Sequence, residues 1–371
     1  MKIGKRYIKV TERRINYYKI SEVAKILGVS QRTIRYYEQM GLLPSARRTK
    51  GRMRLYTDAE VKLIKKIKGL QTDYRMSLEK IREKIELDLN KFVEQREKGK
   101  IKIVVDSTAS LPTSIIKKYG IEVIPMKVIF GKSVFDDGEN MNTDELLKQL
   151  ATGRNTPRTK HPGYEEIISI FNNIYERGAE KIIAINLSSG ISDMVFASRR
   201  AAEYMKHLID IEVIDSRCMA LGSGLLAVEA AKMLQDGKEF SEVVSKINQL
   251  ALKVKEVLLV DSLDYLCRGK DVHEYLSLLL DFKPVFTTEN GKIKLLARAG
   301  DKNEVIDTFI TLSGKAKKGA GIMYSGLKRD ADRLHKEIKQ KAAVGDPIIK
   351  TEISAVPSVY FGPKSLGLAI Y

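Results

Sequence analysis

The sequence contains little cysteine and no long apolar run. Its two cysteines, Cys218 and Cys267, are too few for a disulfide framework, which favours a reducing, cytoplasmic location. No apolar run reaches the ~18 residues that a membrane-spanning helix needs. The basic N-terminal stretch is followed by neither an apolar core nor a small-residue cleavage site, so we expect no secretory signal. These absences favour a soluble cytoplasmic protein.

The sequence also lacks the common signatures of catalysis. None of its four histidines lies at metal-ligand spacing from another histidine or a cysteine. Neither a Gly-x-Ser-x-Gly elbow nor a phosphate-loop lysine motif occurs. The glycine-rich run Leu221–Leu226 begins an apolar helical pattern, and we expect its glycines to serve close packing. We therefore predict no enzymatic activity, no metal and no cofactor.

Basic residues, by contrast, are concentrated at one end of the chain. Residues 1–100 carry 27 Lys and Arg against 12 Asp and Glu, which gives +15 of the total net charge of +18. A localised basic excess is typical of proteins that bind polyanions, because each neutralised phosphate releases counterions. A solvated basic surface or a patch that binds a membrane surface would have the same composition, so charge alone leaves these alternatives open.

The pattern of apolar and capping residues divides the chain into four parts. We expect a flexible basic arm over residues 1–17, a winged helix-turn-helix over 18–76, a connecting or dimerisation helix with its linker over 77–100, and a separate domain over 101–371. In the second part, Ser21 and Ser30 are candidate N-caps of two short helices that end at Gly28 and Gly41. Two short helices joined by a tight turn are the helix-turn-helix pattern.

The second short helix and a small β-ribbon over residues 45–56 are the expected DNA-contacting elements. At helical spacing, Ile34 and Tyr37 face inward, while polar residues face outward. Gln and Arg near the start of such a helix suit base edges in the major groove, and ribbon Arg and Lys suit phosphates. A helical hairpin with a solvated basic face is the alternative. The expected DNA-binding residues are Gln31, Arg32, Thr33, Arg35, Tyr36, Arg47, Arg48, Lys50, Arg52, Arg54 and Tyr56.

This region resembles the mercury-resistance-regulator (MerR) family of transcription factors. The matching stretches are Ile20–Ser30, Arg32–Glu38, Gly41–Pro44, the wing Arg52–Thr57 and Leu78–Ile81. The resemblance implies a homodimer that binds a palindromic promoter and reshapes DNA by indirect readout, with RNA polymerase as a further partner. Apolar spacing between Leu78 and Val93 fits either a short coiled-coil seam or a helix packed on its own domain.

Residues 101–371 alternate between strand-like and helix-like runs, which favours an α/β domain with a mostly parallel sheet. The predicted strands are 101–106, 123–130, 181–187, 211–214, 256–260 and 321–324. The predicted helices are 113–119, 143–151, 164–177, 194–207, 221–235, 241–252, 275–280 and 302–317. Small polar clusters follow three strands, at Asp106–Thr108, Asn186–Gly190 and Asp215–Arg217. Such clusters suit a carboxylate or phosphate, and simple helix caps are the alternative.

The order of these clusters resembles the DegV family of fatty-acid-binding proteins over essentially residues 101–371. The resemblance rests on Val105–Leu111, Pro125–Val128, Ser188–Ser192, Val213–Arg217, Gly222–Gly224, Leu263–Leu266, Lys283–Pro284 and Phe361–Pro363. It implies two α/β lobes with an acyl tunnel between them, and a fatty-acid carboxylate held by Thr159, Ser188 and Ser189. The expected ligand-binding residues are Ser107, Thr108, Thr159, Lys160, His161, Ser188, Ser189, Ser192, Arg298, Tyr324 and Tyr360.

Several positions depart from the DegV pattern. The usual Thr-Ser-Gln-Pro-Ser reads Thr159–Gly163, and the usual Gly-Gly-Arg reads Gly269–Asp271. Tyr324 and Tyr360 stand where the family has histidines, and Lys364 replaces a terminal glycine. In family members that present a fatty acid to a kinase, the Arg and His positions assist that step. Their loss here favours a protein that binds and holds its ligand.

We therefore hypothesise a one-component regulator with a fatty acid, or a related acyl compound, as its effector. One alternative is a fatty-acid carrier that serves a fatty-acid kinase and has an autoregulatory DNA-binding domain. Another is a constitutive repressor whose second domain only dimerises. A ligand that prefers one state by ~2–3 kcal/mol would shift the population tens- to a hundred-fold.

Overall fold

A computed structural model describes most of the chain on both sides of Lys100. The described residues are 17–43, 46–48, 53–86, 101–151, 156–266, 282–314, 316, 319–341 and 348–371. They form two compact units. The first contains the described residues up to position 86 together with Asn173–Ala179, and the second contains Ile101–Asn172 and Glu180–Tyr371. The expected arm before Tyr17, the expected linker over 87–100 and the expected helix over 275–280 lie outside the described residues.

The first unit is a helix-turn-helix with a small antiparallel ribbon. Its elements are β1 (Tyr17–Lys19), α1 (Ile20–Leu27), α2 (Gln31–Gln39), β2 (Arg47–Arg48), β3 (Arg54–Thr57), α3 (Asp58–Thr72) and a helix over residues 78–86. Gly28 ends α1 in the left-handed conformation, with φ of 58°, so the chain turns tightly into α2. The expected N-cap Ser21 is wrong: α1 begins at Ile20 and its N-cap is Lys19, whose N–H donates to Glu22 at 2.6 Å. The strand order β1-β3-β2 confirms the expected ribbon. Tyr17, expected in the arm, instead begins a third strand.

One small core holds the first unit together. Val23 of α1 and Ile34 and Tyr37 of α2 are almost fully buried in one cluster. The predicted inward face of α2 is therefore confirmed. Ile81 and Ile85 belong to the same cluster, so this part of the connecting helix packs on its own unit.

The second unit contains strands and helices along its whole length. Its elements are β4 (Ile101–Asp106), the 3-10 helix η1 (Ser107–Ala109), α5 (Thr113–Tyr119), β5 (Glu122–Ile124), β6 (Lys127–Phe130), β7 (Ser133–Asp136), α6 (Thr143–Ala151), β8 (Arg158–Lys160), α7 (Tyr164–Glu176), β9 (Lys181–Asn186), α8 (Met194–Met205), β10 (Asp210–Asp215), α9 (Leu221–Gln235), α10 (Phe240–Ala251), β11 (Lys255–Leu259), α11 (Leu263–Leu266), β12 (Lys283–Glu289), β13 (Lys292–Ala299), α12 (Lys302–Ser313), β14 (Ala320–Ser325), α13 (Lys328–Lys341), β15 (Ile348–Glu352), α14 (Ala355–Phe361) and β16 (Ser365–Ile370).

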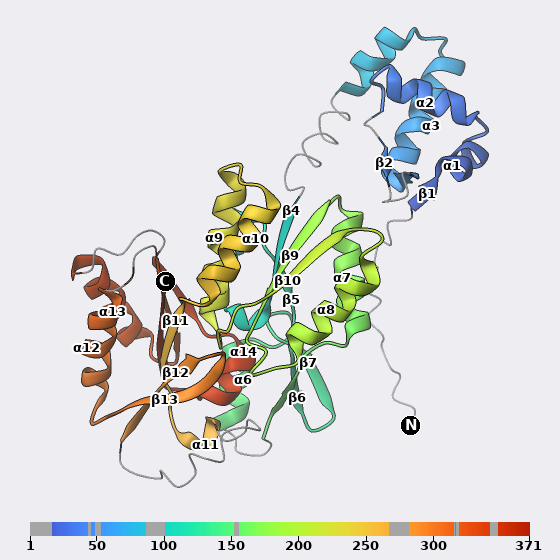
Figure 1. Cartoon of the computed structure of the whole chain (residues 1–371). Helices are drawn as coiled ribbons and strands as arrows, with labels where there is room; N and C mark the ends of the chain where they lie inside the picture. The colour runs from blue at the N-terminus through green and yellow to red at the C-terminus, as the bar shows by residue number, and fades with distance from the viewer. Residues whose placement is uncertain are drawn as a thin grey trace, which may run out of the picture. The chain divides into compact units, whose positions relative to one another are not determined.

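A four-stranded parallel sheet forms one half of the second unit, in the order β10-β9-β4-β5. Its central strand β9 is buried almost throughout, as parallel strands covered on both faces are. Figure 1 shows α9 and α10 on one side of this sheet and α7 and α8 on the other. Because all four strands run in one direction, their carboxyl ends meet at one edge.

The six-stranded sheet corrects the expectation of a mostly parallel domain. Its order is β13-β12-β11-β16-β14-β15, and only β14 and β15 pair parallel. The sequence reading missed β12, β13, β15 and β16. It also predicted one strand over 123–130, where Pro125 separates β5 from β6, because proline lacks the N–H that a ladder needs. Strand β6 instead joins β7 and β8 in a small antiparallel sheet.

Helix α9 lies between the two larger sheets and contacts strands of both. A Cβ on Gly222 would lie 2.6 Å from the Cys218 sulfur, and a Cβ on Gly224 would lie 2.8 Å from the Ala109 carbonyl oxygen. Both distances are shorter than van der Waals contact. The expected close-packing role of this glycine-rich run is therefore confirmed.

Candidate functional sites

The outer face of α2 presents the residues expected to read base edges. Gln31, Arg32, Arg35 and Tyr36 are exposed, and the ring of Tyr36 is 44% exposed. Thr33 is half-buried, and its hydroxyl shares a 2.7 Å hydrogen bond with Ser30. An exposed polar and aromatic face on the second helix has the chemistry that major-groove contacts use.

Hydrogen bonds from three directions fix the orientation of α2. The Ser30 hydroxyl accepts from the Thr33 backbone N–H at 3.0 Å and so caps the helix. The Tyr37 hydroxyl donates to Gln71 of α3 at 2.7 Å. Glu38 accepts from Arg54 at 3.2 Å and from the Tyr56 hydroxyl at 2.7 Å, which joins α2 to β3.

The ribbon agrees only in part with the expected contacts. Tyr56, expected to contact DNA, is 1% exposed and bonded to Glu38; its ring packs in the core because β3 turns it inward. Burial and the Glu38 carboxylate together raise the pKa of the Tyr56 hydroxyl. Arg47 and Arg48 form β2, and Lys50 and Arg52 lie outside the described residues.

The ends of the parallel strands bring together the polar clusters of the second unit. Asp106, at the end of β4, is fully buried and accepts from the Leu187 N–H at 2.8 Å and from Asn186 of β9 at 3.3 Å. It also accepts from the Thr108 hydroxyl and N–H. Burial raises the pKa of Asp106, although these bonds counteract the effect. Thr108, expected to bind ligand, is 1% exposed and belongs to this internal network; its ligand contact stays a prediction.

Ser107 likewise serves a buried carboxylate. Its hydroxyl donates to Asp137 at 2.7 Å and accepts from the Met126 N–H at 3.1 Å. Asp137 also accepts from the N–H groups of Ala355 and Val356 at the start of α14, at 2.8 and 3.3 Å. Burial raises the pKa of Asp137 to about 6 against these bonds, which lower it. Ser107 therefore has a structural role, and its expected ligand contact stays a prediction.

The tandem serines after β9 differ in burial and in partner. Ser188 is fully buried, and its hydroxyl donates to the Gly291 carbonyl oxygen at 2.5 Å. Ser189 is half-buried, and its hydroxyl donates to the Asp215 carboxylate at 2.5 Å. The N–H of Gly190 donates to the Ser188 oxygen at 3.1 Å. Both hydroxyl protons are thus engaged within the protein.

Thr159 and Tyr360 do meet, although 201 residues separate them. Their hydroxyl oxygens lie 2.5 Å apart, with Thr159 on β8 and Tyr360 on α14. Both side chains are half-buried. Since either oxygen can be the donor, the pair retains one hydroxyl proton for a further acceptor.

The other expected ligand residues have separate surroundings. His161 has its Nδ1 2.8 Å from the Pro162 carbonyl, and Lys160 is exposed on β8. The Ser192 hydroxyl accepts from the Met194 N–H at 3.3 Å. Arg298 is exposed on β13 with its guanidinium 5.2 Å from the centre of the Phe282 ring. Tyr324 lies on β14 opposite Glu352 of β15, and burial raises its pKa.

Two features of this region were missed by the sequence reading. The turn Asn290–Gly291 approaches Ser188, and its Asn-Gly pair between two strand-like runs is a recognisable hairpin signal. Asp137 offered no such signal, because its partners lie 30 and 218 residues away.

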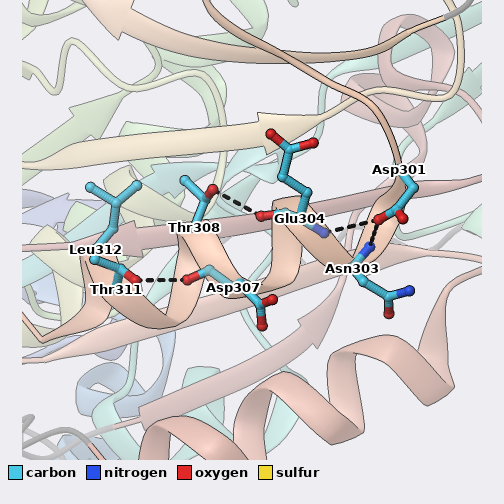
Figure 2. Close-up of a pocket in the computed structure, with 7 residues that line it drawn as sticks. All are labelled: Asp301, Asn303, Glu304, Asp307, Thr308, Thr311 and Leu312. Carbon is cyan, nitrogen blue, oxygen red and sulfur yellow. Dashed lines mark hydrogen bonds between the residues drawn. The ribbon is translucent and has the colours of Figure 1, made fainter.

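The described residues line more than one hollow. One of about 580 Å³ follows the outer face of α12, where Asp301 caps the helix and Thr308 and Thr311 bond back to it (Figure 2). It contains none of the expected site residues. A second, of about 270 Å³, is lined by residues of β4, η1 and β15 together with Asp137. Of the expected site residues, only Ser107 lines it.

Within the described residues, His, Cys, Asp and Glu form no group of three that could hold a metal ion. The same part of the chain has no helix with the length and apolar character to cross a membrane.

Two family models match the chain in succession. A model described as MerR HTH family regulatory protein matches residues 18–87, and one described as Uncharacterised protein, DegV family, matches residues 100–371. A DegV domain-containing protein of Caldanaerobacter subterraneus subsp. tengcongensis is 28% identical over 281 residues, which are 72% of this chain and 98% of that protein. One from Clostridium acetobutylicum is 24% identical over 279 residues, covering 73% and 98%.

Solved structures with the fold of the second unit include two bacterial proteins. A fatty-acid-binding DegV family protein from Thermus thermophilus superimposes with a TM-score of 0.67 at 24% identity, over 73% of this chain and 99% of its own. A stearic-acid-binding protein from Eubacterium ventriosum gives a TM-score of 0.67 at 23% identity, over 73% and 97%. At these identities the likeness concerns the fold.

Proposed function

The chain belongs to the DegV family, and we propose that it is a DNA-binding transcription regulator whose DegV domain takes a fatty acid, or a related acyl compound, as effector. The observation that carries this proposal is the union of two matched parts in one chain. A MerR-type helix-turn-helix with an exposed Gln, Arg and Tyr face precedes a DegV domain that spans nearly the whole length of its relatives.

Charge and helix geometry support the DNA-binding half. The first 100 residues hold +15 of the net charge of +18, and α2 directs its polar residues outward from a rigid core. We propose Gln31, Arg32, Arg35 and Tyr36 for base edges, and Arg47, Arg48, Lys50, Arg52 and Arg54 for phosphates. A homodimer on a palindromic promoter in the cytoplasm, in contact with RNA polymerase, completes this part of the proposal.

The hydroxyl pair of Thr159 and Tyr360 supports the ligand-binding half. A carboxylate accepts hydrogen bonds and donates none, so it needs a free hydroxyl proton, and this pair retains one. Ser188 and Ser189 complete the proposed head-group corner. An acyl chain would add ~0.8 kcal/mol for each methylene that it buries. The fatty acids bound by the structural relatives from Thermus and Eubacterium are the reason to begin with that ligand class.

The test uses the full-length chain, freed of copurifying lipid. Native mass spectrometry and calorimetry with sodium oleate measure ligand binding, and footprinting on the promoter of its own gene measures DNA binding with and without oleate. We expect oleate to bind and to change the promoter affinity or the footprint. Binding without any change at the promoter would favour the carrier alternative, which phosphorylation of bound oleate by a cognate kinase would establish. Neither binding nor change would leave a constitutive DNA-binding protein.

A further inference from the structure

We propose that the Asn290–Gly291 turn is a latch on the proposed head-group corner, held by a hydrogen bond from Ser188 and released when an anionic ligand accepts that hydrogen bond in place of the Gly291 carbonyl. This inference rests on the proposed function, because it concerns how the same corner exchanges ligand for an internal contact. The turn belongs to the six-stranded sheet, whereas Ser188 follows β9 of the four-stranded sheet. The proposed latch therefore adds a mobile hairpin to the proposed ligand site.

The latch is a tight hairpin built for close approach. Strands β12 and β13 pair in a constant register from Phe286 opposite Leu295 to Glu289 opposite Lys292, which leaves a two-residue loop. Asn290 and Gly291 both have positive φ, 51° and 79°, as the favoured two-residue hairpin turn requires. Asn290 is exposed and Gly291 is buried, so the turn inserts its glycine into the protein.

Contact between the turn and the serine loop leaves no room for a side chain. The Ser188 hydroxyl donates to the Gly291 carbonyl at 2.5 Å, and Ser188 is fully buried. A Cβ on Gly291 would lie 2.5 Å from the Ser188 oxygen, and a Cβ on Gly190 would lie 2.6 Å from the Gly291 carbonyl oxygen. The contact between the Ser188 loop and the turn therefore requires glycine at both positions, 190 and 291.

A bound anion would compete with the Gly291 carbonyl for the hydrogen bond that the Ser188 hydroxyl donates. A serine hydroxyl can donate one hydrogen bond. Ser188 donates it to the Gly291 carbonyl, and Ser189 donates its own to Asp215. A carboxylate that binds the Ser188 hydroxyl must become its acceptor, since two acceptors cannot share one hydrogen at full strength. The Gly291 carbonyl then loses its donor, and the two oxygen acceptors repel each other. The turn must therefore withdraw as the ligand enters.

Movement of the Asn290–Gly291 turn away from Ser188 would couple ligand binding at the four-stranded sheet to the six-stranded sheet. Ser188 belongs to the loop after β9 of the four-stranded sheet, and Gly291 belongs to the hairpin of the six-stranded sheet. Ile293 and Leu295 of β13 pack against the core that α9 also enters, so a shifted hairpin changes packing at the centre of the unit.

Hydrogen–deuterium exchange on the full-length protein tests the latch directly. We expect backbone amides 289–293 to exchange about 3- to 10-fold faster in Ser188→Ala and in wild type saturated with sodium oleate, as loss of one hydrogen bond predicts. Ser313→Ala removes another buried serine hydroxyl that donates to a backbone carbonyl, here that of Ile310 at 2.6 Å; it is the control and should leave these amides unchanged. Unchanged exchange in Ser188→Ala would overturn the latch.

Affinity measurements separate the latch from the proposed function. In Gly291→Ala the new Cβ keeps the turn away from Ser188, so we expect oleate to bind about 3- to 10-fold tighter than to wild type. Gly237→Ala is the matched control, with the same φ of 79° but no atom within 4 Å of the new Cβ. If wild type binds oleate and Gly291→Ala binds it no tighter, only the latch fails. If no variant binds oleate, the proposed function fails as well.

Discussion

The Tyr56 hydroxyl on β3 donates a 2.7 Å hydrogen bond to the Glu38 carboxylate on α2 and so ties the ribbon to the exposed helix. Tyr56→Phe keeps the buried ring and removes only this bond. We expect the free energy of unfolding to fall by about 1 kcal/mol and promoter affinity to fall with it, because the ribbon loses its register with α2. Urea unfolding and gel-shift titration measure the two effects. Tyr36→Phe, at an exposed ring, should leave the unfolding free energy within about 0.5 kcal/mol.

Arg35 is exposed on α2 and has no role in the core, so its removal isolates a DNA contact. We expect Arg35→Ala to lower affinity for the promoter by about 1–3 kcal/mol while the melting temperature stays constant. Titrations at several salt concentrations, on promoter and on random duplex, show whether the lost contact is to a base or to a phosphate. Arg199 is exposed on α8 of the second unit, so Arg199→Ala removes the same charge and should bind DNA like wild type.

Asp137 makes the stability of the second unit depend on pH. Its pKa is about 6 in the folded protein, against 3.8 for an unperturbed aspartate, so the folded state holds a proton that the unfolded state releases over this range. Unfolding then becomes easier as the pH rises from about 4 to 6, by at most ~3 kcal/mol. Asp137→Asn removes this titration. We expect the unfolding free energy of wild type, minus that of the variant, to decrease over the same interval.

Urea unfolding at pH 4.5, 5.5, 6.5 and 7.5 on both proteins gives that difference directly. Asp106 and Glu256 are buried carboxylates whose pKa values burial also raises, but they remain in both proteins and cancel. A difference that grows with pH would contradict the prediction. It would mean that the N–H groups of Ala355 and Val356 hold the Asp137 pKa below its ordinary value.

Gly222 is a point of close packing at the start of α9. In Gly222→Ala the new Cβ would lie 2.6 Å from the Cys218 sulfur and 3.0 Å from the Glu256 carboxyl carbon. That carboxylate accepts the Gly222 N–H at 2.5 Å, so a shift of the helix would also strain a buried hydrogen bond. We expect a loss of about 2–4 kcal/mol in unfolding free energy. Gly314→Ala, at a φ of −62° with its nearest neighbour 3.5 Å away, should cost much less than Gly222→Ala.

Local patterns carried most of what the sequence could predict. The turn at Gly28, the cap at Ser30 and the inward pair Ile34 and Tyr37 depend on residues within one or two helical turns, and all appear as expected. The helices over 113–119, 143–151 and 221–235 also match, because their periodicity is strong and their ends are marked.

Long-range pairing is what the sequence could not reveal. Strand β16 inserts between β11 and β14, although more than 100 residues separate it from β11, and no local signal encodes that choice. The same limit applies to the site. Ser107 and Thr108 have the composition of a ligand cluster, yet their hydroxyls donate hydrogen bonds to the carboxylates of Asp137 and Asp106. Partner identity, rather than residue type, separates a ligand contact from a structural one.

Thr159 and Tyr360 share a hydrogen bond that leaves one hydroxyl hydrogen available in the proposed head-group corner, and their coupling is measurable. We expect Thr159→Val and Tyr360→Phe each to weaken oleate binding by about 5- to 30-fold, as loss of a hydrogen bond to a charged group predicts. The double variant should lose little more than either single one, because each hydroxyl orients the other. Tyr204→Phe, at an exposed ring on α8, is the control. Additive losses would mean that the two hydroxyls bind the ligand independently, and unchanged affinity in both single variants would place the head group elsewhere.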